Sequence, residues 1–508
     1  GTTGGVIPKR AYWAGRKYIR DVREGAVLLI SRIRGIKDSM IGTAKVSKGR
    51  DAEPPAVWQR PGEGISGSAG PRKDRRELRI LFLSHIFPYP LDNGAHIRTH
   101  RMMEALARLG RVDWVGYTSE GGEGRLPGRE AMENFRGLCA SAQVLCDPPR
   151  ESSRARNGIR AFGRQLLRRE PEMYATYPAA PLLRRARQQA GMADLIWVGS
   201  MHLAHWLRDS GERMIVDTID LHAVRAARER ALEPMSLMKL AKRIEIGKLE
   251  HEEKMAVRRY SRVVVCSEKE RAFWSPADRD SVWVVPNGLC ETLLQDCERE
   301  EAQDRLVFVG TLEYMPNEDA VLWFCKEILP RVARQVPTVS FVVVGRNPSR
   351  RLIELHDGGR VKVIGRVPDV TPYVREAAVS VVPLRAGGGT RLKILESLAL
   401  GTPVVSTSIG AEGLALEPER EILIADNPEA FASAVVRLLR ADRLRREMSE
   451  AGRERVKAHY GWRAIQDGLA ARVEEWARER GLPGTSRGYA ESAAGLENDA
   501  RRVCGANV

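Results

Sequence analysis

Short runs of apolar residues alternate with longer amphipathic stretches along most of the chain. The first run, Leu78–Ser84, is mostly apolar, as expected for a buried strand of a parallel sheet. Similar runs follow, separated by helix-length segments such as the charged stretch 223–260, and they lie at 112–117, 194–198, 213–217, 262–266 and 281–285. This alternation predicts an α/β protein with a mainly parallel, doubly wound sheet.

A second series of apolar runs begins after the acidic stretch 291–304, which we interpret as a linker. The runs lie at 306–310, 340–345, 361–365, 379–383 and 403–406. Two Rossmann-like halves of this kind place a ligand cleft between them, at the carboxyl ends of their strands. Because no long internal repeat is visible, we expect the halves to share an architecture and not a sequence.

The same pattern predicts the segments of the chain. Residues 1–75 form a basic, flexible extension that ends in a Gly, Pro and Ser-rich stretch. The remaining segments are an N-terminal Rossmann-like domain, the linker, a C-terminal Rossmann-like domain, a last helix and a frayed tail, at 76–290, 291–304, 305–461, 462–480 and 481–508.

The segment Gly387–Glu396 predicts a glycine loop that leads into a buried helix. Unpaired N–H groups and the positive end of the helix dipole meet at such a helix start, and the glycines allow an anion to approach closely. We expect Thr390 to be the N-cap and Arg391 to offer a fork for phosphate oxygens. Lys393 and Glu396 are close enough to share a ligand, or to form an ordinary ion pair on a packing helix.

A net charge of +16 favours anionic partners such as nucleotide-linked substrates, nucleic acid or an anionic membrane surface. We find no aromatic residues interleaved along a basic stripe, so we do not expect nucleic-acid binding. The seven cysteines show no paired Cys-x-x-Cys spacing, which predicts neither a zinc site nor a disulfide framework.

No apolar run approaches the ~18 residues that a membrane-spanning helix requires. An amphipathic helix is expected over about 12–35, and this basic extension and the basic region 154–187 would be attracted to anionic headgroups. A solvated appendage is the alternative for the extension. We expect a cytoplasmic protein, peripheral at the inner face of the cell membrane.

Several motifs occur in the order and spacing of one known family. They are Val285–Gly288, Phe308–Thr311, Val363–Asp369, Gly387–Gly401 and Tyr460–Trp462. Through them the chain, from about Leu78 to Trp476, resembles the GT-B glycosyltransferases. The resemblance is to the retaining glycosyltransferase family 4, also called glycosyl transferases group 1, as found in bacterial cell-surface polysaccharide assembly.

The resemblance implies that the second domain holds a nucleotide-sugar donor and the first domain the acceptor, with a helix crossing back at the end. Such enzymes stabilise the departing diphosphate with Arg, Lys and helix N-termini, so no metal and no other cofactor is expected, and we see no convincing Asp-x-Asp metal motif. Glu396 would bind the donor ribose, and residues 363–365 would meet the base. The implied donor-binding residues are Gly94, Gly310, Val363, Ile364, Gly365, Gly388, Gly389, Thr390, Arg391, Lys393 and Glu396.

The chain departs from the family pattern at two places. The family has two glutamates separated by seven residues, and counting back from Glu396 reaches Gly388, so the acidic residue usually assigned to the transferred sugar is missing. The Arg and Lys usually found after the first strand of the second domain are also absent from Gly310–Asn317. Arg391 and Lys393 would have to take over that role.

In the first domain, Asp92–His96 resembles the family's early glycine turn, where Gly94 would let the chain approach the donor or the acceptor. A plain strand-to-helix turn is the alternative. His85 and His96 are further cleft candidates, although a histidine on a loop is more often only solvated.

The segment Asp217–His222 follows a predicted strand, where relatives keep a cleft histidine. Asp220 falls nearest that position and His222 lies two residues later. Either side chain can exchange a proton with an acceptor hydroxyl or contact the sugar, and a carboxylate that caps the next helix is the alternative for Asp220. Ser267–Glu270 has the spacing of a capping box.

The resemblance therefore implies a retaining, metal-independent hexosyltransferase-type enzyme that transfers a sugar from a nucleotide donor to a saccharide or lipid-linked saccharide. Its expected catalytic residues are Asp220, His222, Arg391 and Lys393. The alternatives are a GT-B nucleotide-sugar epimerase or hydrolase, which releases nucleotide without an acceptor, and a catalytically silent GT-B scaffold.

Overall fold

The computed structural model describes residues 56–59, 77–91, 93–118, 129–146, 169–176, 180–233, 237–295 and 302–483. All the described residues belong to one compact unit of the chain. The expected amphipathic helix and most of the extension 1–75 lie outside the described residues. So do much of the basic region 154–187, the residue Asp92 and the tail from 484 onward.

The first domain is built on a sheet whose described strands follow the order β1-β4-β3-β2-β5-β6-β7-β8. Neighbours from β4 to β8 are parallel, and β1 joins the edge antiparallel to β4. The prediction of a mainly parallel, doubly wound sheet is confirmed, although the apolar pattern did not single out β1 or β4. The strands are β1 (Ala56–Gln59), β2 (Leu78–Ser84), β3 (Gly110–Thr118), β4 (Ser141–Cys146), β5 (Leu195–Val198), β6 (Met214–Asp217), β7 (Arg262–Val265) and β8 (Val282–Val284).

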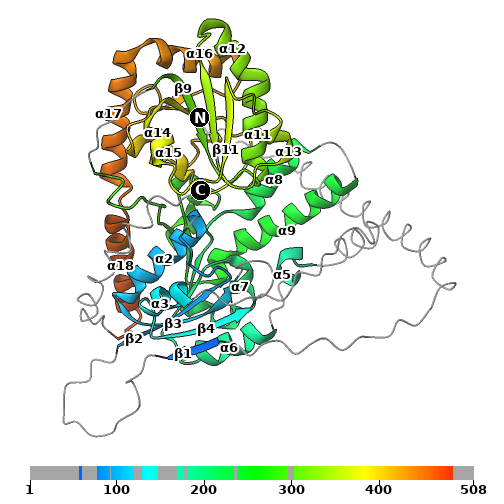
Figure 1. Cartoon of the computed structure of the whole chain (residues 1–508). Coiled ribbons are helices and arrows are strands. Elements are labelled where there is room, and N and C mark those ends of the chain that lie inside the picture. The colour runs from blue at the N-terminus through cyan, green and yellow to red at the C-terminus, as the bar shows by residue number, and fades with distance from the viewer. Residues whose placement is uncertain are drawn as a thin grey trace, which may run out of the picture. The chain divides into compact units, whose positions relative to one another are not determined.

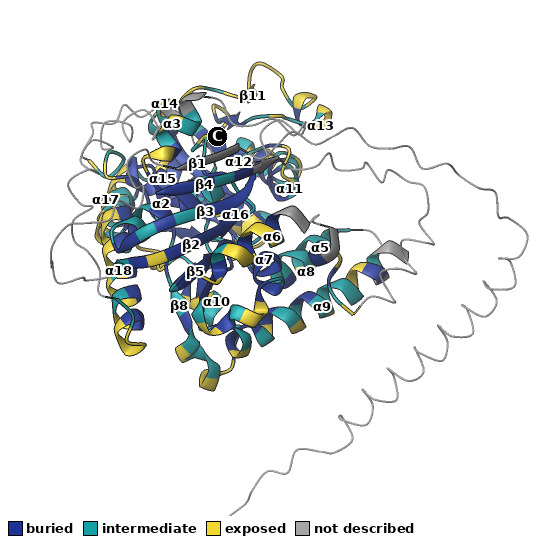
Figure 2. Cartoon of the chain, turned by 90° about the horizontal axis from the view of Figure 1, so that it is seen from below, coloured by how far each residue is buried: buried dark blue, intermediate teal, exposed yellow. Residues whose placement is uncertain are grey.

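Helices cover both faces of this sheet, and the strands between them are largely buried (Figure 2). The charged stretch 223–260 forms two of them, as expected. Ser267 is the N-cap that the capping-box spacing predicted, because its Oγ accepts from Glu270 N at 3.2 Å, but the Glu270 side chain accepts from Cys266 N and not from Ser267 N. The helices are α2 (Gly94–Ala107), α3 (Arg129–Arg136), α5 (Glu172–Thr176), α6 (Ala180–Ala190), α7 (Met201–His205), η3 (Arg208–Arg213), α8 (His222–Leu232), α9 (Leu237–Arg259), α10 (Glu268–Arg271) and η4 (Pro276–Ser281).

The second domain contains a wholly parallel sheet in the order β11-β10-β9-β12-β13-β14. Its strands are β9 (Ala302–Val309), β10 (Ser340–Val344), β11 (Val361–Gly365), β12 (Ala377–Val382), β13 (Val404–Ser406) and β14 (Leu423–Ile424). Its helices are α11 (Met315–Trp323), η5 (Phe324–Ile328), α12 (Leu329–Gln335), α13 (Arg350–Ile353), α14 (Thr371–Arg375), α15 (Leu392–Ala399), α16 (Pro428–Arg440) and α17 (Asp442–His459). One core cluster joins all of these helices except α14 to β9, β10, β12 and β13, and Val374 of α14 belongs to a smaller cluster with Val307 and Val342.

The last helix, α18 (Trp462–Glu479), returns to the first domain and runs beside α2 (Figure 1). Trp462, Val473 and Trp476 belong to the same buried cluster as Leu78 and Phe82. Trp476 Nε1 also donates to Ser261 Oγ at 2.7 Å. Burial of several large side chains therefore holds α18 against the first sheet.

Cys139, Cys266 and Cys325 are free thiols, whereas Cys290 is disulfide-bonded, which the cysteine spacing did not predict. Among the helices that the structure describes, none combines the length and apolar character needed to cross a bilayer. Within the described ranges, no group of three or more His, Cys, Asp or Glu side chains is arranged to hold a metal ion.

Candidate functional site

The glycine loop Gly387–Arg391 links β12 to α15 at the carboxyl end of the second sheet. Gly387 and Gly389 have φ values of 110° and 67°, a region that glycine adopts without steric cost. The prediction that Thr390 is the N-cap is wrong. The chain stays non-helical through Arg391, which holds the N-cap position without a side-chain bond, and α15 begins at Leu392.

A pocket of about 250 Å³ lies beside this loop, and we call it the cationic pocket. The second domain supplies most of its wall, and the start of α2 closes it from the first domain. A Cβ at Gly94 would lie only 3.2 Å from Leu392 Cδ1, so glycine allows α2 to approach α15 this closely. The lining residues are Asn93, Gly94, Val309, Gly310, Thr311, Tyr314, Pro316, Asn317, Leu384, Ala386, Gly387, Gly388, Thr390, Arg391, Leu392, Lys393 and Glu396.

Lys393 is a mostly buried cation of this pocket. Its Nζ donates to Asn317 Oδ1 at 2.8 Å and lies 4.2 Å from the centre of the Phe308 ring. Burial, together with the charge of Arg391, lowers the pKa of Lys393 to about 7, and Glu396 opposes both effects. Glu396, itself buried, lines the same pocket, so the two side chains face a shared space.

Arg391 is 7% exposed and also lines the cationic pocket. Its Nη1 donates to the carbonyl oxygens of Gly388 and Gly389, so the guanidinium folds back onto the glycine loop. Burial lowers the pKa of Arg391, whereas the nearby Asp220 raises it. The cleft therefore holds two closely spaced cations whose charges are incompletely solvated.

A second pocket of about 240 Å³ lies along the same loop, and we call it the carboxylate pocket. Here the first domain supplies most of the wall. The two pockets share Gly388 and Thr390. The lining residues of the carboxylate pocket are Asp220, Leu221, Val224, Arg228, Ser267, Lys269, Glu270, Ala272, Phe273, Gly388, Gly389, Thr390, Glu412 and Gly413.

Asp220 stands between the domains on the turn from β6 to α8. Burial raises its pKa, and Arg225, Arg391 and Arg228 oppose that rise; Arg225 Nη1 lies 3.3 Å from Asp220 Oδ2. The carboxylate packs directly against Gly388: a Cβ added there would overlap it, and the three nearest atoms all belong to Asp220. Asp220 thus occupies the space that a side chain at position 388 would take.

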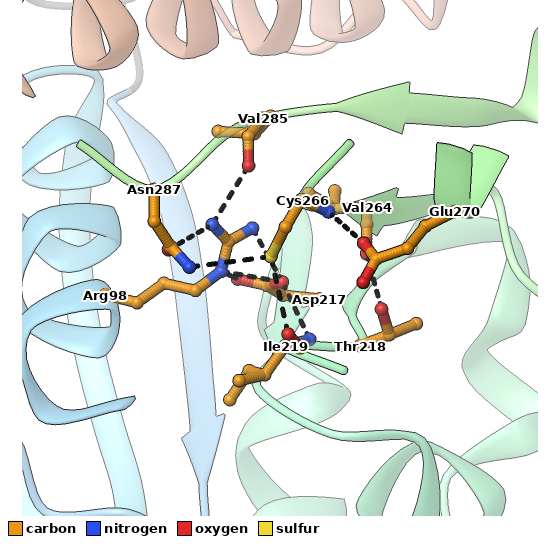
Figure 3. Close-up of polar contacts among 9 residues, drawn as sticks. All are labelled: Arg98, Asp217, Thr218, Ile219, Val264, Cys266, Glu270, Val285 and Asn287. Carbon is orange, nitrogen blue, oxygen red and sulfur yellow. Dashed lines mark hydrogen bonds and ion pairs between the residues drawn. The ribbon is translucent and has the colours of Figure 1, made fainter. Parts of the chain in front are cut away.

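A buried network beneath this turn holds it in place (Figure 3). Arg98 of α2 donates to both oxygens of Asp217, with Nε 2.8 Å from Oδ2 and Nη2 2.9 Å from Oδ1. Its Nη1 donates to Val285 O and Asn287 Oδ1, each at 2.9 Å. Burial disfavours the charged form of Arg98, but the carboxylate of Asp217 favours it more strongly. The pKa of Arg98 is therefore raised.

The same network fixes an unusual backbone conformation next to Asp220. Ile219 has a φ of 58°, which is strained for a β-branched residue. Asp217 Oδ1 accepts from Ile219 N at 3.2 Å, and Cys266 Sγ donates to Ile219 O at 3.3 Å. The sequence analysis missed Arg98, although Asn287 lies in the Val285–Gly288 motif that it singled out.

His222 opens α8 but lines neither pocket. Its Nδ1 lies 3.0 Å from Arg225 Nη2, and burial, Arg225 and His85 lower its pKa to about 3, so its ring is neutral at physiological pH. Burial also lowers the pKa of His85 to about 4, and the His85 ring packs against His202 at 4.6 Å. His96 Nδ1 instead contacts Pro90 O at 2.5 Å.

The residues expected at the nucleotide base lie outside both pockets. Val363, Ile364 and Gly365 end β11 at the edge of the second sheet, and Ile364 is 39% exposed. Of the other expected donor residues, Gly94, Gly310, Gly388, Thr390, Arg391, Lys393 and Glu396 line the cationic pocket, whereas Gly389 lines the carboxylate pocket.

Helix α8 also ties the first domain to the glycine loop. Arg228 Nη1 donates to Gly387 O at 3.1 Å and forms an ion pair with Glu412 of the second domain at 2.5 Å. Tyr314 Oη donates to Glu229 at 3.5 Å. The two domains therefore meet through side chains that surround both pockets.

Two Rossmann-like domains facing a shared site, with a last helix returning to the first domain, define the GT-B fold. Solved structures with this fold include sucrose-phosphate synthase from Thermosynechococcus elongatus, with a TM-score of 0.55, 18% identity and coverage of 79% of this chain and 100% of that one. The Anabaena protein HepE, in complex with UDP and glucose, gives a TM-score of 0.53 at 14% identity, with coverage of 78% and 99%.

Sequence comparison finds a family match within the second domain. Residues 303–441 match the family described as glycosyl transferases group 1. A phosphatidyl-myo-inositol mannosyltransferase of Mycobacterium leprae is 28% identical over 36% of this chain and 50% of its own length. A D-inositol 3-phosphate glycosyltransferase of Acidothermus cellulolyticus is 26% identical over 42% and 52%. The chain thus spans about half the length of these relatives. It has the GT-B fold, and the part that is similar to glycosyl transferases group 1 is its second domain.

Proposed function

We propose that this protein is a glycosyltransferase that transfers a sugar from a nucleotide-sugar donor to a saccharide or lipid-linked saccharide. The observation that carries the proposal is the mostly buried ammonium of Lys393, which faces a pocket at the start of α15. A buried cation in such a place is costly unless an anion compensates it. The diphosphate of a nucleotide sugar meets that requirement.

The cationic pocket suits the departing diphosphate. Lys393 and Arg391 supply positive charge at the start of α15, where the helix dipole also favours an anion. Groups that are already oriented stabilise charge as it develops in the transition state. We extend the proposal to transfer without a metal ion and with retention of configuration. The two cations support the first point, and resemblance to glycosyltransferase family 4 supports the second.

Glu396 and Gly310 complete the proposed donor site. Glu396 offers carboxylate oxygens to the ribose hydroxyls from the same wall as Lys393. A Cβ at Gly310 would lie 2.5 Å from Lys393 Nζ, so glycine is needed for the ammonium to reach its position. By resemblance to the family, we also propose that residues 363–365 meet the nucleotide base and that His222 contacts the substrate.

The relatives suggest a role in cell-surface polysaccharide assembly. One, a protein of unknown function in the Klebsiella pneumoniae cps region, is 26% identical over 26% of this chain and 36% of its own length. The Mycobacterium leprae relative is named as a phosphatidyl-myo-inositol mannosyltransferase. We therefore propose a cytoplasmic enzyme at the inner face of the membrane, which a net charge of +16 would favour.

The test uses the full-length protein with a panel of UDP-, GDP- and ADP-sugars, measuring donor binding and nucleoside diphosphate release. Lys393→Met should lose donor binding by about 100-fold or more. The matched control is Lys326→Met, because Lys326 is 82% exposed. Absence of both binding and release with every donor would refute the proposal. Release that never yields a glycosylated product would point to a hydrolase or epimerase.

A further inference from the structure

Helix α8 begins at the interdomain site without a cap from its own segment. Its first residue is His222, and its N-cap residue is Leu221, whose side chain makes no capping hydrogen bond. The first N–H groups of a helix have no partner within the helix, and they need an acceptor when they are buried. Ala223 is only 3% exposed, so its N–H requires an acceptor from elsewhere in the fold.

Glu253 of α9 supplies this acceptor from 30 residues further along the chain. Both of its carboxyl oxygens lie 3.3 Å from Ala223 N. Glu253 is 1% exposed, and α8 and α9 pack side by side. The sequence analysis did not single out Glu253, because a cap that comes from another helix leaves no local pattern.

Glu253 also contacts the second element that forms the first-domain wall of the carboxylate pocket. Its backbone oxygen accepts from Trp274 Nε1 at 3.1 Å. Phe273, the neighbour of Trp274, lines this pocket, as do Leu221 and Val224 at the start of α8. Glu253 itself lines neither pocket. It can therefore act on the site only through the elements that it holds.

Charged and titratable groups from three neighbouring elements face the Glu253 carboxyl. Burial raises the pKa of Glu253 to about 8, the N–H groups at the start of α8 oppose that rise, Asp220 adds to it, and Arg225 of α8 opposes it. Tyr174 of α5 is the third neighbour, because burial and the charge of Glu253 both raise its pKa. Ionisation of Glu253 would place two buried carboxylates at one helix start, where they repel each other.

We propose that Glu253 is a positioning residue of the interdomain site, which holds the start of α8 so that Asp220 meets the glycine loop, and that loss of its carboxyl proton weakens this hold. The inference rests on the proposed glycosyltransferase function and adds regulation of that site by pH. Asp220 lies directly before Leu221, and its carboxylate packs against Gly388. A shift of the α8 start would therefore separate groups that must stay closely placed for catalysis.

The test compares Glu253→Met and Glu253→Gln with wild-type protein. Methionine offers only a weak acceptor to the Ala223 N–H, whereas glutamine keeps a neutral oxygen acceptor that does not titrate. Glu250→Met and Glu250→Gln are the matched controls, because Glu250 lies on the same helix with a side chain 46% exposed. The probe is the nucleotide sugar that wild type binds best, and its affinity and its rate of transfer or hydrolysis are measured.

Glu253→Met should lower kcat about tenfold at pH 7 and leave donor affinity within about twofold of wild type. Amide hydrogen exchange, followed by mass spectrometry over residues 218–232, should become about tenfold faster at the start of α8 in this variant. Glu253→Gln should match wild type at pH 7 in all three measurements. Both Glu250 variants should match it as well.

The pH profile separates a titrating carboxyl from an ordinary structural cap. With saturating donor, the kcat of wild type should fall above pH 8 by up to about tenfold per pH unit. Glu253→Gln should not show this fall, because an amide keeps its charge state. Saturating donor keeps Lys393 out of the comparison, since a bound diphosphate favours the charged ammonium.

Unchanged kcat in Glu253→Met would overturn the inference, and faster exchange alone would then mark a cap with no role in the site. A fall above pH 8 that persists in Glu253→Gln would also overturn it, by assigning the titration to another group. If Glu253→Met does not fold, the profile of Glu253→Gln still decides. Failure of the proposed function is distinguishable, because wild type would then bind no nucleotide sugar, whatever the exchange at α8 shows.

Discussion

The cationic pocket and the carboxylate pocket lie along one glycine loop but differ in charge and in origin. The first presents Arg391 and Lys393 from the second domain, and the second presents Asp220 and Glu270 from the first domain. The loop itself carries no acidic side chain. Charges of the opposite sign are also present, Glu396 in the first pocket and Arg228 and Lys269 in the second, but both pockets draw their walls from both domains, so neither domain completes the site alone.

Gly388 shows how closely the two contributions depend on each other. At this position the family pattern has a glutamate, and here the Asp220 carboxylate of the other domain fills the space beside the glycine. Unlike Gly387 and Gly389, Gly388 has no positive φ. The backbone at Gly388 would therefore tolerate a side chain, but a side chain there would overlap the carboxylate of Asp220.

The largest effect on the rate of transfer should come from exchanging the residues at positions 220 and 388, which moves the carboxylate from the first domain to the second. We expect Gly388→Glu and Asp220→Gly each to reduce transfer by about 100-fold, the first through overlap and like-charge repulsion and the second through loss of the charge. The double variant Asp220→Gly with Gly388→Glu should recover at least about tenfold. Steady-state transfer rates measure this.

The control for that exchange is Asp220→Gly with Gly388→Ala, which relieves the overlap but restores no charge. It should remain as inactive as Asp220→Gly alone. Equal recovery in the two double variants would show that only space matters at this contact. A carboxylate at the contact between positions 220 and 388 would then have no role in transfer.

The second effect concerns the support beneath Asp220. Arg98→Met should lower the free energy of unfolding by about 3–5 kcal/mol, because it leaves Asp217 buried without its partner. Arg108→Met is the control, since its ion pair with Asp467 is exposed and should contribute less than about 1 kcal/mol. Urea unfolding followed by tryptophan fluorescence compares them. Similar losses in both variants would mean that the network does not stabilise the carboxylate pocket.

Local sequence patterns were sufficient for much of the architecture. Strands such as β2 and β10 are apolar runs of four or more residues, and the glycine loop combines a helix start with glycines at its bend. These features depend on neighbours in the sequence. The prediction failed at Thr390, because the loop continues through Arg391 before the helical hydrogen bonds begin.

The contacts between distant segments could not be predicted in the same way. Asp220 meets Gly388 only because two domains pack together, and no local pattern encodes that contact. Arg98 has the charge of a surface residue, yet five hydrogen bonds within the fold satisfy it. The sequence placed Glu270 in a capping motif. That Glu270 also lines a pocket depends on the tertiary structure.

The third effect is a pH dependence of donor affinity, which we assign to the cationic pocket. Lys393 has a pKa of about 7, set by burial and by Arg391 against Glu396, while Asn317 and Phe308 add no titratable group. As pH rises through 7 the ammonium loses its proton, so donor affinity should fall by up to about tenfold per pH unit. A nucleotide sugar is a suitable probe, because its diphosphate diester does not titrate near neutral pH.

Lys393→Arg distinguishes this explanation from a general loss of structure, since a guanidinium keeps its charge across the range. Its donor affinity should be nearly constant from pH 6 to about 8.5, whatever its absolute value. Calorimetry in two buffers of different ionisation enthalpy would also count the protons taken up on binding. An equally steep profile in Lys393→Arg would assign the titration to another group.

The smallest effect should arise where α8 touches the loop that both pockets share. Arg228 holds the Gly387 carbonyl and pairs with Glu412, and both side chains are partly exposed. Such a pair contributes on the order of 1 kcal/mol, so Arg228→Met should change kinetic constants only a few-fold. Because Gly387 belongs to the common loop, donor and acceptor KM should rise together. Arg230→Met, whose guanidinium contacts only Lys239 O among the described contacts, should leave both unchanged. A rise in one constant alone would mean that the two pockets respond separately to the loop.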